Sequence, residues 1–188
     1  MYAADLSYLG TYSPDRQLAL EELLIKPASV LAEYQFLIAG AMYPNSGAWS
    51  LNIRHFDHIS PPDHCAFYSS SPLTLNVTRA SMACSGFCPS GRLFEAAACG
   101  TAVLSDWWVG LDAFFEPGEE ILIAASSSDS ISRITSDREL LNRVGAKARQ
   151  RTLDCHTADI RARRLLDLLE NPVDEICPQR DAYVSECT

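Results

Sequence analysis

The chain has 188 residues, with 47% hydrophobic and 21% charged side chains and a formal net charge of -9 at pH 7. This composition is typical of a soluble globular protein that buries a sizeable core. The negative charge argues against nucleic acid as a partner, because a phosphate backbone repels an acidic surface. No apolar run approaches the ~20 residues of a membrane span, and the N-terminus lacks the basic and apolar regions of a signal peptide, so we expect a cytoplasmic protein without a membrane span.

Strand-like and helix-like patterns alternate along most of the chain. Short apolar runs predict strands at 6–9, 34–39, 52–56, 73–77, 102–105 and 120–124. Helical spacing of apolar residues predicts helices at 18–31, 61–69, 91–99, 111–115, 128–134, 139–153 and 158–169. This alternation favours an α/β fold, a Rossmann-like parallel sheet with helices on both faces, followed by a helical C-terminal segment.

The chain reads as one domain over residues 5–170, followed by a tail at 171–188 that is irregular or disordered. Pro27 is expected to kink or split the helix that contains it, because proline removes a helical hydrogen bond. Residues 78–89 are expected to form a loop. The seven cysteines are scattered without the paired spacing of zinc sites, so we expect no metal.

The loops that follow the strands are the expected location of a ligand site. In open parallel sheets, ligands bind beyond the carboxyl ends of the strands. The loops to consider therefore start at Gly10, Gly40, Thr78 and Asp106. Asp106 either touches the ligand or pairs locally. Arg79 either neutralises a phosphate or pairs with a carboxylate, Glu95 or Asp106.

The helix predicted at 91–99 has the features of an anion-binding helix start. Ser90 is a plausible N-cap, and the free backbone N–H groups and the helix dipole at this end favour a phosphate. Gly91 lets a ligand approach the backbone closely. Arg92 adds a charge-assisted contact.

Glu95 lies one turn further along this helix, in a small apolar segment that we expect to be buried. An unpaired buried carboxylate costs several kcal/mol, so Glu95 needs a partner. One interpretation is that it accepts hydrogen bonds from the hydroxyls of a sugar whose phosphate lies at the helix start. The other is a structural ion pair with Arg79 or Arg92.

A long segment of the chain resembles a known enzyme family. The stretch GFCPSGRLFEAAACGTAVLSDWWVGLDAFFEPGEEILIA, residues 86–124, is similar to the donor-binding half of GT-B glycosyltransferases, and within them to the spore-maturation, CgeB-like family. Further similar stretches are LSYLGTYSPDRQ at 6–17, FYSSSPLTLNVTRA at 67–80 and HTADIRARRLL at 156–166. The resemblance covers about residues 5–169.

The resemblance implies a role for several of these positions. Glu95 would bind the ribose of a nucleoside diphosphate sugar, and Ser90, Gly91 and Arg92 would lie beside its diphosphate. The loop after the first strand, with Gly10 and Thr11, would line the cleft near the phosphates, and Arg16 would take the place of a basic residue found there in relatives. Charge on the leaving diphosphate would be stabilised without a required metal.

The sequence departs from the family pattern in two respects, and both limit this assignment. Many retaining GT-B enzymes have another acidic residue about two turns before the glutamate, where this chain has Phe87, so the catalytic residue is unknown. A whole GT-B enzyme also has an N-terminal, acceptor-binding domain, which this sequence does not contain. Hexosyltransferase activity is therefore expected only with that domain as a partner, in cis or in trans.

Two other classes of protein are compatible with the same fold. A non-catalytic donor-domain remnant would serve as a binding or assembly module and would bind nucleotide weakly or not at all. A flavodoxin-like or response-regulator-like domain shares the α/β plan. A response regulator needs an acidic cluster after its first strand, and the Gly10-Thr11-Tyr12 segment lacks one.

Overall fold

The computed structural model describes residues 1–44 and 48–171. Its centre is a six-stranded, fully parallel sheet in the order β3-β2-β1-β4-β5-β6. The strands are β1 (Leu6–Leu9), β2 (Phe36–Ala39), β3 (Ile53–Phe56), β4 (Leu73–Asn76), β5 (Ala102–Ser105) and β6 (Leu122–Ile123). The predicted Rossmann-like parallel sheet is confirmed. The tail expected after residue 171 lies outside the described residues.

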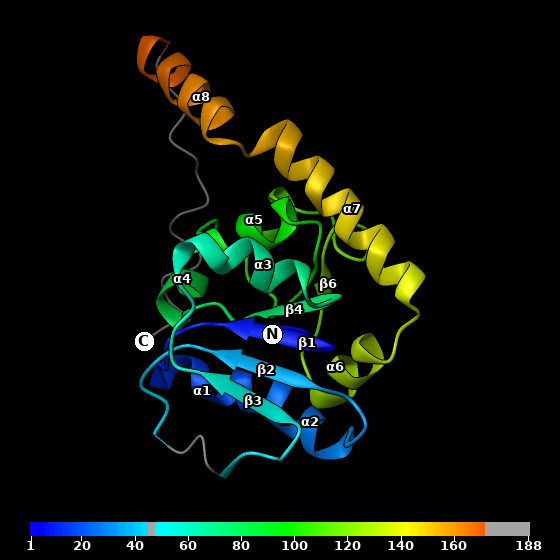
Figure 1. The fold of residues 1–188 in the computed structure, drawn as a ribbon. Coiled ribbons are helices and arrows are strands. Elements are labelled where there is room, and N and C mark those ends of the chain that lie inside the picture. The colour runs from blue at the N-terminus through cyan, green and yellow to red at the C-terminus, as the bar shows by residue number, and fades with distance from the viewer. Residues whose placement is uncertain (45–47, 172–188) are drawn as a thin grey trace.

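Helices cover both faces of this sheet (Figure 1). The first face carries α1 (Pro14–Leu20), the π-helical turn η1 (Glu21–Ile25), α2 (Lys26–Val30) and α6 (Ser127–Ile134). The second face carries α3 (His64–Ser69), α5 (Gly91–Ala98) and α7 (Arg138–Cys155). Side chains alternate between the faces along each strand, so Phe36 and Ile38 enter the first core while Leu37 and Ala39 enter the second.

The break expected at Pro27 is present as a change of helix type. The residues before it form η1, and α2 begins at Lys26 with Pro27 in its first turn. A proline has no N–H to donate to the preceding turn, and a π-helical turn is one way for a helix to absorb the missing bond.

Most remaining elements lie where the sequence predicts them. They are the 3₁₀ turns η3 (Pro61–Asp63) and η4 (Leu111–Ala113), and the helices α4 (Ala80–Ser85) and α8 (Ala158–Glu170). Helix α4 was expected to be part of a loop. Its six residues bury no side chain, so no apolar periodicity marked it.

The order of the strands creates one topological switch point, between β1 and β4. The chain builds outward from β1 through β2 to β3, and from β4 through β5 to β6 in the other direction. Crevices that bind ligands form at such points, outside the carboxyl ends of the strands. A hydrogen bond of 3.1 Å from the Ser7 hydroxyl to the Thr74 hydroxyl joins the two strands in the core.

Two glycines close the carboxyl ends of β1 and β2 against each other. A Cβ on Gly40 would lie 2.0 Å from the carbonyl oxygen of Gly10, which is an impossible distance. Gly40 also has a positive φ of 151°. Only glycine fits this close approach of two backbones.

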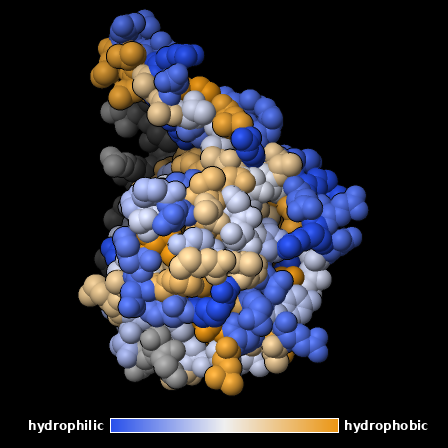
Figure 2. All heavy atoms as spheres, in the orientation of Figure 1, coloured by the Kyte–Doolittle hydropathy of each residue, from blue (hydrophilic) through white to orange (hydrophobic). Residues whose placement is uncertain are grey.

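The C-terminal helix α8 projects away from the body of the domain (Figure 1). None of its residues is buried. Hydrophobic side chains on it are exposed among hydrophilic ones, as Figure 2 shows at the top of the view. They are Leu165, Leu166, Leu168 and Leu169. Among the described residues, no helix combines the length and the apolar character that crossing a bilayer requires.

Candidate functional site

The loop from β1 to α1 carries a buried cation at the switch point. Arg16 is only 5% exposed, and its Nη2 donates to the backbone carbonyl of Thr11. Its Nε is buried without a hydrogen-bond partner, and no ion pair joins it to a carboxylate of the described residues. A buried charge without a partner is costly, so this guanidinium is held in place by the fold at a cost in stability.

Asp106, at the carboxyl end of β5, binds the loop after β4. Its carboxylate accepts hydrogen bonds from the Thr78 backbone N–H at 3.1 Å and from the Thr78 hydroxyl at 2.9 Å. The Ser105 hydroxyl donates a further bond of 3.3 Å. Burial raises the pKa of Asp106, and the bonds from Thr78 and Ser105 oppose that rise. Asp106 therefore fixes the position at which the chain leaves β4.

Arg79 follows Thr78 and links this loop to the β1–α1 loop. Its Nη2 donates to the Ser13 hydroxyl at 3.2 Å, and the Asp15 carboxylate accepts from the backbone N–H of Ala80 at 3.2 Å. The two loops on either side of the switch point are thus joined. The expected ion pairs of Arg79 with Glu95 or Asp106 are absent from the described residues, because the side chain turns toward Ser13 instead.

The start of α5 has the predicted cap. Ser90 has extended backbone angles, and its hydroxyl accepts from the Arg92 backbone N–H at 3.4 Å. Gly91 is exposed, and the position that a Cβ would occupy on it lies 3.9 Å from Oε1 of Glu95. The carboxylate of Glu95 therefore lies close to the free N–H groups of the helix start.

Glu95 is not buried, contrary to the expectation from its apolar neighbours. Leu93, Ala96 and Ala97 form the buried face of α5, while half of the Glu95 side chain, 50%, is exposed. The reason is helical spacing, since residues i, i+3 and i+4 share the inward face. Its ion-pair partner is His64 on α3, with 3.5 Å between Nδ1 and Oε2, and not Arg79 or Arg92.

Tyrosines surround these charged groups, and no sequence motif marks them as part of the site. The Tyr43 hydroxyl donates to the Gly10 carbonyl at 2.8 Å. The Tyr68 hydroxyl is buried without a partner, and burial raises the pKa of Tyr68, with the charge of Glu95 adding to the rise and that of Arg92 opposing it. Tyr8, on β1, is also buried, and desolvation raises its pKa.

The two tryptophans after Asp106 have different environments. Trp108 is 3% exposed and packs against Phe114, so its role is structural. Trp107 is 51% exposed. Its ring is available at the surface for a ligand or a protein partner.

The described residues contain no group of three or more histidine, cysteine or acidic side chains that could hold a metal ion. Hollows are also present among these residues, and two of them have defined linings. One, of about 380 Å³, borders the β1–α1 loop and is lined by Tyr12, Gln17, Glu21, Ile25, Tyr43, Pro44, Ala48 and Trp49.

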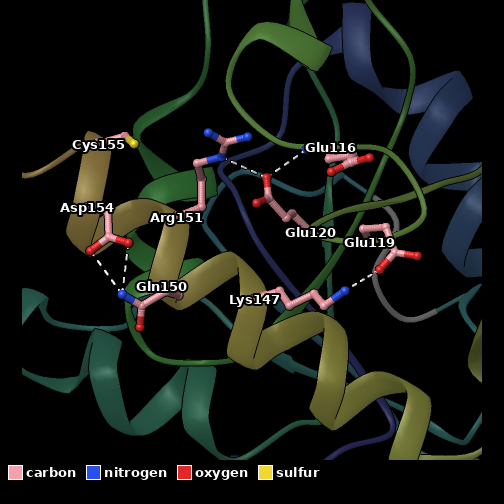
Figure 3. A pocket seen from close by; sticks show the side chains of 8 residues that line it. All are labelled: Glu116, Glu119, Glu120, Lys147, Gln150, Arg151, Asp154 and Cys155. Atoms are coloured by element: carbon pink, nitrogen blue, oxygen red, sulfur yellow. Dashed lines mark hydrogen bonds and ion pairs between the residues drawn. The ribbon is translucent and has the colours of Figure 1, made fainter.

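The other hollow, of about 400 Å³, lies between α7 and the segment before β6 (Figure 3). Its two cations each pair with a glutamate: Arg151 with Glu120 at 2.9 Å, and Lys147 with Glu119. The side-chain amide of Gln150 donates to Asp154 at 2.9 Å. Neither Glu95 nor Arg16 lines this hollow.

Comparison with protein families identifies the chain. Residues 16–167 match the family described as glycosyl transferase-like. The chain belongs to this family. The matched segment includes Arg16, Arg79, Glu95 and Asp106, and therefore the loops on both sides of the switch point. No curated protein sequence matches this glycosyl transferase-like chain.

Solved structures of low sequence identity share its fold. Sucrose-phosphate synthase from Thermosynechococcus elongatus aligns over 90% of this chain and 46% of its own, with a TM-score of 0.69 and 16% identity. Anabaena HepE in complex with UDP-glucose aligns over 88% of this chain and 48% of its own, with a TM-score of 0.68 and 11% identity. The pneumococcal O-GlcNAc transferase GtfA in complex with UDP and GlcNAc aligns over 88% and 35%, with a TM-score of 0.62 and 15% identity.

These matches show that the glycosyl transferase-like chain has the Rossmann-like fold found in GT-B glycosyltransferases. The chain spans less than half the length of each of these three structures.

Proposed function

We propose that the chain is the donor-binding domain of a glycosyltransferase and binds a nucleoside diphosphate sugar at the switch point between β1 and β4. The observation that carries this proposal is a set of groups at that point: the buried Arg16 without a carboxylate, the open start of α5, and the half-exposed Glu95 one turn further on. Cations and a helix N-terminus bind a diphosphate, and a carboxylate accepts from a vicinal diol.

Each group has a distinct role in this proposal. Arg16 and Arg92, with the N–H groups after Ser90, bind the diphosphate and stabilise the charge that grows on it as it leaves. Glu95 binds the ribose. Gly10 and Thr11 line the cleft beside the phosphates, and Gly91 lets them approach the backbone. Asp106 and Arg79 hold the loops in position through Thr78 and Ser13.

The structural neighbours support the choice of ligand. HepE was solved with UDP-glucose, and GtfA was solved with UDP and GlcNAc. Both structures contain a uridine nucleotide with or attached to a hexose or a hexosamine. A diphosphate site next to a ribose site accepts ligands of this chemistry. UDP is therefore the first nucleotide to test.

The full reaction requires a second, acceptor-binding domain, supplied in cis or in trans. The exposed leucines of α8 are a surface that such a domain would cover, since apolar side chains grouped on one helix mark an interaction site. The sequence supports three further parts of the proposal. Residues 5–170 form the donor-binding unit. The chain belongs to the CgeB-like branch and acts in the cytoplasm.

The test is calorimetric titration of the chain with UDP, GDP, ADP and TDP, repeated with Glu95→Ala. Loss of hydrogen bonds to a charged group should weaken binding of the preferred nucleotide by about 1.5–3 kcal/mol. Glu119→Ala is the matched control, because it removes a glutamate from the hollow of Figure 3. Unchanged affinity in a folded Glu95→Ala protein would contradict the assignment of the ribose site.

A non-catalytic binding or assembly module is the alternative function. The exposed leucines of α8 favour this alternative, because exposed apolar side chains grouped on one helix indicate a protein partner. A well-folded chain that binds none of the four nucleotides, with or without an added acceptor domain, would support this alternative and overturn the donor-binding proposal.

A further inference from the structure

The contact between His64 and Glu95 joins α3 to α5, and β4 and α4 lie between these two helices in the sequence. His64 is the first residue of α3, and α3 packs against α5. The imidazole and the carboxylate are 30% and 50% exposed, so a ligand at the start of α5 can reach both. Their separation of 3.5 Å lets a small rotation of either side chain form a direct hydrogen bond.

The imidazole is held in this place by the ring of Tyr68. The two rings meet edge to face, with centroids 6.4 Å apart. Tyr68 is 2% exposed and packs against Phe67, so it forms a fixed wall behind the histidine. The imidazole therefore has little freedom except toward Glu95 and the solvent.

On the basis of the proposed function, we propose that His64 is a positioning residue for Glu95 and makes donor binding stronger as the pH falls. The imidazolium donates its Nδ1 proton to Oε2 of Glu95 and fixes the orientation of the carboxylate. The Oε1 atom, on the side of Gly91, remains free to accept from the ribose hydroxyls. The positive charge also attracts the anionic donor.

Histidine is the side chain whose charge ordinarily changes between pH 5 and 8. Because the donor is anionic, its binding favours the protonated imidazole, and by reciprocity the protonated imidazole favours the donor. Affinity should therefore decrease as the pH rises through this range.

Other titratable and charged groups face this pair from α3, α5, α7 and the preceding turn. They are Asp63, Cys65, Tyr68, Arg92, Cys99 and Arg149. The variants decide which group accounts for a pH dependence of the affinity. A dependence that is lost only in His64→Gln belongs to His64.

The experiment measures affinity as a function of pH with a ligand that does not itself titrate. The probe is the glucose ester of whichever of the four nucleotides binds, starting with UDP-glucose, whose esterified diphosphate keeps its charge between pH 5.5 and 7.5. For the unmodified chain we expect the dissociation constant to increase about fivefold across this range, the scale of a partly exposed charge pair. For His64→Gln we expect it to change less than about twofold.

Two further variants complete the design. His58→Gln changes an exposed histidine outside this contact and should keep the full pH dependence. Glu95→Gln should bind weakly, and in the double variant with His64→Gln the effects should not add, because His64 acts through Glu95.

The outcomes separate this inference from the proposed function. A flat profile in His64→Gln alone supports the inference. An unchanged pH profile in His64→Gln, with affinity still dependent on Glu95, overturns the inference and leaves the donor site standing. Absence of binding for all four nucleotides overturns both.

Discussion

The switch point between β1 and β4 and the hollow of Figure 3 are both rich in charge, but they differ in how that charge is satisfied. In the hollow, Arg151 and Lys147 each have a glutamate partner. At the switch point, Arg16 is buried with an unpartnered Nε, and no ion pair of the described residues includes Arg16, Arg79 or Arg92.

The difference indicates which region binds a ligand. Charges that are paired within the protein contribute modestly to stability and have little left to offer a ligand. A buried cation without a partner lowers stability and is retained where it binds an anion. The size of a hollow is therefore a poorer guide here than the state of its charges.

Among the variants that contrast these two regions, the largest effect is expected from Arg16→Met. Removing the guanidinium should weaken binding of the preferred nucleoside diphosphate by about 10- to 100-fold, the scale of charge-assisted hydrogen bonds. The free energy of unfolding should stay the same or increase, because a buried unpaired charge is replaced by an apolar side chain of similar length. Calorimetry and urea denaturation measure the two quantities. If Arg16→Met had a lower free energy of unfolding and normal nucleotide affinity, Arg16 would be a structural residue and not part of the ligand site.

A smaller and opposite effect is expected from Arg151→Met on the other side of the comparison. Loss of the ion pair with Glu120 should lower the free energy of unfolding by at most about 1 kcal/mol, since the Arg151 side chain is 38% exposed and partly screened by solvent. Nucleotide affinity should not change. A loss of affinity would show that the hollow of Figure 3 takes part in binding.

The smallest effect concerns His156, at the end of α7. Burial lowers the pKa of His156, whose Nε2 donates to the Phe114 carbonyl at 3.0 Å and whose Nδ1 accepts from Arg161 at 2.9 Å. A depressed folded-state pKa means that stability is present above the unfolded value, near 6.5, and decreases as the pH falls. Between pH 7 and 5 the loss should be less than about 1 kcal/mol, because the site is only partly buried.

Urea denaturation at several pH values checks this, with His156→Gln as the comparison. Glutamine can donate to the Phe114 carbonyl but does not titrate, so its stability should depend less on pH in this range. An equally steep dependence in the variant would assign the effect to other groups.

Much of this fold could be predicted from the sequence. All six strands, the parallel sheet and the Ser90 cap follow from local apolar runs and a capping residue.

The details of the candidate site were harder to predict. The expected burial of Glu95 was wrong because only Leu93, Ala96 and Ala97 share the inward face of α5, and helical spacing places Glu95 outside that face. The pairing of Glu95 with His64 depends on how α3 packs against α5. The bond from Arg79 to Ser13 depends on the crossing of the chain at the switch point. Neither contact has a local sequence signal.

The backbone contact between Gly10 and Gly40 has a consequence for tracing the ancestry of this domain. Any side chain at position 40 would collide with the Gly10 carbonyl. Many residues around these strand ends can therefore change during evolution, but Gly40 cannot be replaced unless the two loops move apart. We therefore expect relatives with the same arrangement of these two loops to retain a glycine at this position.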